Sequence, residues 1–227
     1  EFLRKNDGIG ESTPAINLTE EGCSQTEWLK RTIALEKLND WKGMRDWCRK
    51  WKKSDPINAV AWYNLGIAYI NLKRYVDAIK AFRQALRINP EHAKTRYKLG
   101  NAYSNLNRYN DAIDAYRQAI RINPEYAEAW GNLGHVYNTI KRYDDAIDAC
   151  RQALRINPEY ATVWCNLGIT YGNLKRYDEA IDACRQALRI DPEDATAWIT
   201  LGITYRSLKR YDEAIDACRQ ALRINPE

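Results

Sequence analysis

The sequence repeats itself with a period of thirty-four residues, and this period constrains the fold more than any other feature. Residues 175–190 and 209–224 both read KRYDEAIDACRQALRI. Prolines mark the same period along most of the chain, at Pro56, Pro90, Pro124, Pro158, Pro192 and Pro226. A fixed period of roughly 20–50 residues is typical of chains built from stacked copies of one small unit. We therefore expect a repeat architecture, although 227 residues would ordinarily suggest one or two globular domains.

The period divides the chain into consecutive segments. A polar N-terminal tail, residues 1–24, precedes a degenerate unit, residues 25–58, that keeps the register of the later ones. Five aligned units follow, at residues 59–92, 93–126, 127–160, 161–194 and 195–227, the last of which is one residue short. These seven segments are the predicted domain organisation.

Each full unit contains two apolar stripes at helical spacing. In the first full unit, Trp62, Leu65 and Tyr69 lie on one face of a predicted helix, and a second stripe centred on Phe82 follows a polar interruption. Pro90 ends the second helix, because proline lacks a backbone N–H and moves the preceding residue out of the α region. The unit therefore predicts a helical hairpin.

These residues resemble the tetratricopeptide repeat family. Its pattern of tryptophan, leucine-glycine and tyrosine, followed by alanine, an aromatic residue, alanine and proline, is present at Trp62, Leu65, Gly66, Tyr69, Ala78, Phe82, Ala85 and Pro90. The second unit departs from it once, with Arg96 in place of the tryptophan. The resemblance covers Gln25 onward. It implies an all-α fold, a right-handed α-solenoid of stacked helix-turn-helix repeats.

The cysteines follow the repeat and not a metal-binding or redox motif. None of the six forms a C-x-x-C pair, so a zinc or thioredoxin-like site has no support. Cys48, Cys150, Cys184 and Cys218 occupy the position of Phe82 in their own units, which predicts small, unpaired core residues. We expect Cys150, Cys184 and Cys218 to be buried and Cys165 to be more accessible. No metal, cofactor or catalytic residue is predicted.

The first helices of the units carry the candidate binding residues. In the family these helices line a concave groove, and at the groove positions the units of this chain differ from one another. Amides dominate there, flanked by aromatic, aliphatic and a few basic residues. The predicted peptide-binding residues are Tyr63, Asn64, Lys94, Tyr97, Lys98, Asn101, Asn132, His135 and Asn166.

The amides favour an extended peptide or protein segment as the partner. An amide supplies a donor and an acceptor, as a peptide backbone requires. Equivalent groove positions of successive units are expected to lie about 10 Å apart. This distance matches the spacing of roughly every third residue along an extended strand. The arrangement is similar to the asparagine ladder in the repeat domain of O-GlcNAc transferase, with breaks at Lys98 and Thr200. The alternative, that these amides only solvate an exposed face, stays open.

Charge at the start of the groove favours an acidic side chain or a C-terminal carboxylate of the ligand. Asn64, Lys94 and Lys98 occupy three of the places with which many family members hold a terminal carboxylate. The other two places hold Leu29 and Ile33, which cannot bind an anion. We therefore expect a weaker anion site and not the full carboxylate clamp.

The predicted function is a protein-interaction scaffold and not an enzyme. One alternative is a targeting module of a larger enzyme. A second is nucleic-acid binding along paired arginines of the second helices, such as Arg151 and Arg155. Asp114, Asp148, Asp182 and Asp216 each precede one of those arginines by one helical turn, which favours local ion pairs instead. Net charge +5 does not indicate nucleic acid by itself, and no apolar run reaches membrane-spanning length. A cytoplasmic location is expected.

The two ends of the chain depart from the regular pattern. Trp47 and Trp51 replace alanines of the full units, so residues 25–58 are expected to pack differently and to cap the stack. Residues 42–53 also carry six basic residues, for which a solvated cap face is favoured over a nucleic-acid or membrane patch. The tail, with five acidic and two basic residues, is expected to dock on the cap or in a groove. No polar final helix follows the last hairpin, which suggests a fragment or an end that pairs with another copy.

Overall fold

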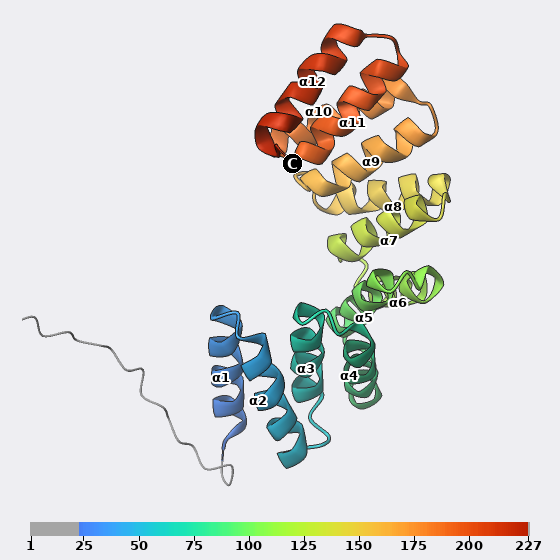
Figure 1. Ribbon diagram of the computed structural model, residues 1–227. Helices are drawn as coiled ribbons and strands as arrows, with labels where there is room; N and C mark the ends of the chain where they lie inside the picture. The colour runs from blue at the N-terminus through green and yellow to red at the C-terminus, as the bar shows by residue number, and fades with distance from the viewer. Residues whose placement is uncertain (1–22, 227) are drawn as a thin grey trace, which may run out of the picture.

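The computed structural model describes residues 23–226, and this part of the chain is helical from end to end (Figure 1). Turns join consecutive helices, and no strand occurs among the described residues. The predicted all-α solenoid is confirmed. The helices are α1 (Gln25–Lys37), α2 (Trp41–Ser54), α3 (Ala59–Asn71), α4 (Tyr75–Ile88), α5 (Ala93–Asn105), α6 (Tyr109–Ile122), α7 (Ala127–Thr139), α8 (Tyr143–Ile156), α9 (Ala161–Asn173), α10 (Tyr177–Ile190), α11 (Ala195–Ser207) and α12 (Tyr211–Ile224).

The turn inside each hairpin has the same backbone conformation. One residue of each turn adopts a positive φ between 53° and 62°, and the residues concerned recur every thirty-four positions: Asn39, Lys73, Asn107, Lys141, Lys175 and Lys209. A left-handed residue just after a helix reverses the chain and lets its N–H satisfy a carbonyl of the last turn. Lys175, for example, donates its N–H to the Gly172 carbonyl oxygen over 3.0 Å.

The two helices of a hairpin approach most closely at a glycine of the first helix. A Cβ atom on Gly66 would lie 2.4 Å from Cε1 of Phe82, and one on Gly134 would lie 2.7 Å from the Cys150 sulfur. Glycine is therefore required at this position. The aromatic ring or thiol of the second helix occupies the space that a side chain would need.

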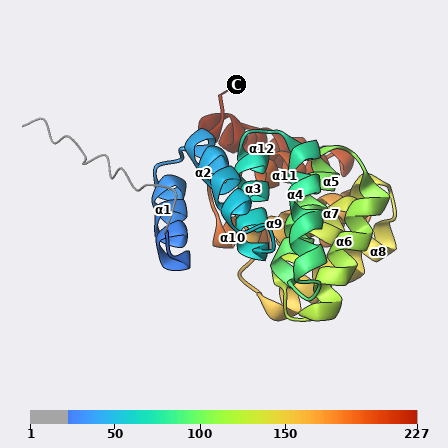
Figure 2. The ribbon, with the colours of Figure 1, turned by 90° about the horizontal axis from the view of Figure 1, so that it is seen from below.

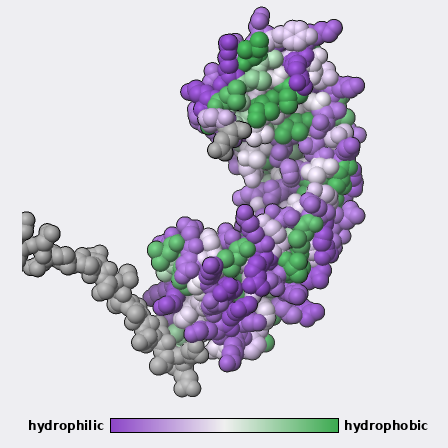
Figure 3. All heavy atoms as spheres, viewed as in Figure 1, coloured by the Kyte–Doolittle hydropathy of each residue, from purple (hydrophilic) through white to green (hydrophobic). Residues whose placement is uncertain are grey.

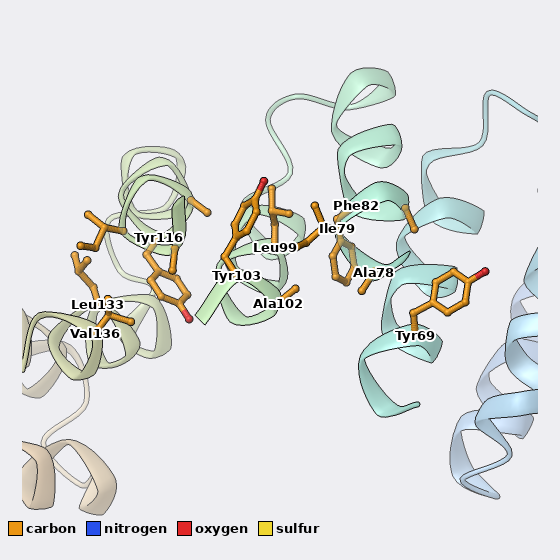
Figure 4. Close-up of a cluster of buried hydrophobic side chains, with 14 of the residues drawn as sticks. Tyr69, Ala78, Ile79, Phe82, Leu99, Ala102, Tyr103, Tyr116, Leu133 and Val136 are labelled. Atoms are coloured by element: carbon orange, nitrogen blue, oxygen red, sulfur yellow. The ribbon is translucent and has the colours of Figure 1, made fainter. Parts of the chain in front are cut away.

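The hairpins stack into a crescent, and the largest cluster of buried apolar side chains extends from Met44 of α2 to Ala149 of α8. First helices α3, α5, α7, α9 and α11 contact one another in order, whereas the second helices pack mainly on first helices. The first helices therefore line the inner side of the curve (Figures 1 and 2). Side chains from successive hairpins meet without a break in the core, as Tyr69, Phe82, Tyr103, Tyr116 and Val136 show (Figure 4).

Polar ties between hairpins differ from the predicted local ion pairs. Among the described residues, only Asp216 of the four predicted aspartates pairs with its arginine, Arg219, at 3.4 Å. Instead, Arg83, Arg151 and Arg185 each donate a hydrogen bond to a tyrosine hydroxyl of the following hairpin, on Tyr103, Tyr171 and Tyr205 respectively. The prediction therefore holds for Asp216 and was wrong for Asp114, Asp148 and Asp182, whose arginines contact a tyrosine of the following hairpin instead. An exposed ion pair contributes little, while a tyrosine offers both a hydroxyl and a ring.

The first hairpin packs through tryptophans. The rings of Trp28 and Trp51 stack with centroids 5.8 Å apart, and the Trp47 ring lies 4.2 Å from that of Trp28. Trp51 is fully buried in this cluster. The expectation that residues 25–58 pack differently is confirmed, while their capping role stays a prediction.

Two of the cysteine predictions were wrong. Cys48, Cys150 and Cys184 are fully buried, but Cys218 is exposed, because within residues 23–226 no hairpin packs over the outer face of α12. Cys165 is buried, because Ala187 and Ala197 of the neighbouring helices close over it. All six thiols are free.

The expected docking of the tail, residues 1–24, falls almost entirely outside the described residues. Within residues 23–226, none of the helices combines the length and apolar character that a membrane span requires.

Candidate functional site

The inner side of the crescent carries a row of aromatic side chains. Tyr63 on α3 and Tyr97 on α5, both among the predicted site residues, are half-buried there. The ring of Tyr63 meets His92 edge-on with centroids 5.6 Å apart, and the ring of Tyr97 lies 5.0 Å from that of Tyr126. In the next hairpin glycine stands at the equivalent place, and the Tyr160 ring lies 3.7 Å from a Cβ built on it.

This row includes residues that the sequence analysis missed. His92, Tyr126 and Tyr160 immediately precede α5, α7 and α9, and their side chains make no capping hydrogen bond. A signal was present, because this last position of the units varies while the proline and glutamate before it recur. In contrast, Asp194 at the same position caps α11 by accepting from the N–H groups of Thr196 and Ala197.

A hydrogen-bond network holds the middle of the groove. Asn132 Nδ2 donates to Tyr97 Oη over 3.1 Å and to Asn101 Oδ1 over 3.0 Å. Tyr116 Oη donates to the same Asn101 oxygen over 2.8 Å. Asn101 Nδ2 and Asn132 Oδ1 are left without a protein partner among residues 23–226. The network therefore leaves one donor, Asn101 Nδ2, and one acceptor, Asn132 Oδ1, for a ligand.

Two cavities flank this network. The first, of about 270 Å³, lies between α3 and α5 and is lined by Val60, Tyr63, Asn64, His92 and Lys94. The second, of about 530 Å³, lies between α7, α9 and the start of α11 and is lined by Asn132, His135, Asn166, Asp191 and Asp194. Every predicted site residue except Tyr97, Lys98 and Asn101 lines one of the cavities.

The two ends of the groove differ in charge. Lys98 is half-buried on α5 with its ammonium 5.4 Å from the centre of the Tyr97 ring. Burial, and then the charge of Lys94, lower the pKa of Lys98, while Glu36 and Glu128 raise it. The second cavity is acidic, with Asp191, Glu193 and Asp194 in its wall. The end that holds Lys94 and Lys98 is therefore basic, whereas the wall of the second cavity is acidic.

Burial shifts the pKa of two titratable groups of the groove. Burial raises the pKa of Tyr63 to about 12, so this phenol keeps its proton at neutral pH. His92 has a lowered pKa through burial and then through Lys94, and its Nδ1 lies 2.6 Å from Thr95 Oγ1. Within residues 23–226, no group of three histidine, cysteine or acidic side chains is placed to hold a metal ion.

Comparison with known families decides the classification. A sequence profile described as the C-terminal domain of cilia and flagella-associated protein 70 matches residues 92–226. The tetratricopeptide repeat profile itself matches residues 59–92. The chain belongs to the tetratricopeptide repeat family. No curated protein sequence matches this tetratricopeptide repeat chain.

Solved structures of other repeat proteins have the same fold. The chain is 28% identical to MamA, with a TM-score of 0.65, over 71% of this chain and 95% of MamA. It is 25% identical to a chain of the Cut9–Hcn1 hetero-tetramer, with a TM-score of 0.76, over 89% of this chain and 40% of that one. YrrB, a repeat protein with an unusual peptide-binding site, is 22% identical with a TM-score of 0.64, over 79% of this chain and 93% of YrrB.

Proposed function

We propose that this tetratricopeptide repeat chain is a scaffold that binds an extended peptide or protein segment along α3, α5, α7 and α9, without chemistry of its own. The observation that carries the proposal is the hydrogen-bond network of Tyr97, Asn101 and Asn132. It presents one free donor and one free acceptor beside an aromatic row, which is the combination an extended backbone with side chains requires. The related fold of YrrB, which carries a peptide-binding site, agrees with this use.

The proposed ligand places an acidic side chain or its C-terminal carboxylate beside Asn64, Lys94 and Lys98. Lys98 loses part of its hydration where it lies, and a carboxylate would restore charge stabilisation. Asp191 and Asp194 repel an anion from the other cavity. The ligand therefore runs in one direction, with its anionic group at the N-terminal hairpins.

Amides at the groove positions of the later hairpins supply affinity with little sequence preference. Asn166 is half-buried in the second cavity, and His135 is exposed beside it. Both carry polar groups that any peptide backbone can engage. Selectivity in this proposal therefore comes from the charged end and not from the amides.

A display library of random twelve-residue peptides with free C-termini tests the proposal. The wild-type chain should select peptides with aspartate, glutamate or a terminal carboxylate at a constant position. Lys98→Glu should lose this preference and about one to two decades of affinity for the selected peptides. Arg121→Glu, the same charge change at an exposed position of α6, is the matched control. It should change neither the preference for acidic peptides nor their affinity. Asn166→Ala should weaken acidic peptides and their amidated versions alike. Equal effects of Lys98→Glu and Arg121→Glu would show that the anionic group of the peptide does not bind beside Lys98.

The outer arginines do not favour nucleic acid. Besides the arginines that bond to tyrosines, Arg155, Arg189 and Arg223 pair with glutamates of the preceding hairpin, at 3.6, 3.2 and 3.1 Å. Phosphate would have to displace these partners. Free thiols at six positions fit a reducing compartment, so the cytoplasm is the proposed location.

A further inference from the structure

A cavity of about 700 Å³ lies between the second helices α8 and α10, over α9, within the stack of hairpins. Helix α9 contributes Trp164 and Leu167 to its lining, and α10 contributes Asp182 and Gln186. We call this cavity the outer cleft, because the second helices form the outer side of the crescent, where apolar and hydrophilic side chains lie side by side (Figure 3). A cavity of about 500 Å³ repeats it thirty-four residues on, with Trp198, Leu201, Asp216 and Gln220 at the equivalent positions.

Most charged side chains of the outer cleft already have partners. The pairs are Arg151 with Tyr171, Arg155 with Glu125, Arg185 with Tyr205, and Glu179 with Arg176. Within residues 23–226, the carboxylate of Asp182 and the amide of Gln186 have no partner. The indole N–H of Trp164 is taken by the Pro158 carbonyl oxygen, over 2.8 Å, which leaves the face of the ring. The cleft therefore offers an indole face, an unpaired carboxylate and an amide.

In the first full unit, the chain itself places a cation over the equivalent tryptophan. Trp62 stands at the position of Trp164, three repeats earlier. Lys52 of α2 has its Nζ atom 4.3 Å from the centre of the Trp62 ring, where the ring quadrupole attracts it. Leu154 stands at the position of Lys52 in the outer cleft, so this lysine has no counterpart there.

In the second unit, the cation replaces the tryptophan. Arg96 stands at the position of Trp164, two repeats earlier, and donates from Nε to the Pro90 carbonyl oxygen over 3.0 Å. Its Nη1 donates to Oε1 of Gln118, the residue that corresponds to Gln186. Two junctions between hairpins therefore hold a basic side chain of the chain itself at the place that the outer cleft leaves open.

We propose that the outer cleft binds an arginine or lysine side chain of a partner protein. The aliphatic stem lies against Trp164 and Leu167, and the charged end pairs with Asp182 and donates to Gln186. Arginine suits these groups best, because its guanidinium stacks on an aromatic face and carries five N–H donors.

The repeated cavity indicates a partner segment with two basic side chains. Equivalent points on neighbouring hairpins lie about 10 Å apart. At the repeat of the cleft, Asp216 pairs with Arg219 at 3.4 Å, and both side chains are exposed. An exposed pair of this kind contributes little, so an incoming guanidinium can replace Arg219.

The probe for this site is the peptide acetyl-Pro-Arg-Pro-Pro-Arg-Pro-amide. In the polyproline II conformation, three residues make one turn and rise about 9 Å, so both arginines lie on one side. The ¹⁵N-labelled full chain is titrated with the peptide, and the indole N–H signals are followed by NMR. Trp164→Phe and Trp198→Phe assign two of these signals. Both should shift with one binding curve, whereas the signal of Trp62, whose ring Lys52 covers, should not.

Matched variants identify the groups that bind the peptide. Asp182→Asn should weaken binding about two- to fivefold, since it removes one exposed ion pair. Asp114→Asn is the control, because Asp114 is the equivalent exposed residue at the junction that holds Arg96, and it should leave Kd unchanged. Trp164→Arg copies the second unit and should leave binding only at Trp198. Citrulline in place of both arginines should abolish the shifts, because it keeps the shape of the side chain and removes its charge.

Other results overturn the proposal. These are an absence of shifts at millimolar peptide, equal binding of the citrulline peptide, and equal effects of Asp182→Asn and Asp114→Asn. Weaker binding in Asp191→Asn, without a shift of the Trp164 signal, would place the basic peptide in the acidic cavity of the groove instead. None of these outcomes depends on an acidic ligand beside Lys98, so the proposed function is tested separately.

Discussion

Arg185 of α10 donates from Nη2 to Tyr205 Oη of α11 over 3.1 Å, and so ties one hairpin to the next. The same contact recurs between Arg83 and Tyr103 and between Arg151 and Tyr171. A polar contact of one kind therefore accompanies the buried apolar clusters along the stack. In a solenoid, stability depends on such nearest-neighbour interfaces.

Loss of this hydroxyl should weaken the interface. Tyr205 is 5% exposed, so Tyr205→Phe removes a largely buried acceptor and should cost about 1 kcal/mol of unfolding free energy. Tyr211→Phe is the control, because Tyr211 is 60% exposed. Urea denaturation followed by tryptophan fluorescence measures both variants. Equal midpoints for Tyr205→Phe and Tyr211→Phe would show that the bond contributes nothing.

Much of the fold could be predicted because its information is local and repeated. The spacing of Trp62, Leu65 and Tyr69 and the position of Pro90 define helices and their ends wherever they recur. Gly66 and Phe82, both part of the family pattern, meet where the two helices approach most closely.

Features that depend on the neighbouring hairpin could not be read from one unit. Cys184 and Cys218 have identical sequence surroundings, yet only Cys184 has a hairpin stacked over it. Arg151 has Asp148 one turn away but bonds to Tyr171, which is twenty residues further on. Tyr126 and Tyr160 were missed because the groove was sought within the helices and not in the residues just before them.

The two glycines of α9 should respond to alanine with opposite sign. A Cβ on Gly168 would lie 2.7 Å from the Cys184 sulfur and 3.3 Å from the Ala180 carbonyl oxygen, so Gly168→Ala should destabilise by roughly 1–3 kcal/mol. A Cβ on Gly172 meets only Thr204 Oγ1, at 3.9 Å, so Gly172→Ala should stabilise by about 0.5–1 kcal/mol through helix propensity. Thermal denaturation separates the two. Destabilisation by both would mean that the helices cannot accommodate even a free methyl group at this face.

Glycine in place of a lysine at the left-handed turn position should stabilise the folded protein. Lys141 has φ 62°, a conformation that costs an ordinary residue roughly 1 kcal/mol relative to glycine. Lys141→Gly should therefore raise the unfolding free energy by up to about 1 kcal/mol. Lys80→Gly, in the exposed interior of α4, should lower it by about the same amount. Chemical denaturation measures both, and a loss of stability in Lys141→Gly would show that the lysine side chain itself supports the turn.

Buried thiols should make the protein lose stability at alkaline pH. Burial raises the pKa of Cys184 from an ordinary value near 9.0 to about 12. Between these values the unfolded chain releases the thiol proton and the folded chain keeps it, so the stabilisation is complete below pH 9 and is lost as pH rises towards 12. At about pH 10.5 one such thiol should cost roughly 2 kcal/mol relative to pH 8. Cys184→Ala should recover that difference. Urea denaturation of the wild-type chain and of Cys184→Ala at several pH values between 8 and 10.5 measures the slopes. Identical slopes in the two proteins would show that the Cys184 thiol does not stay protonated in the folded protein.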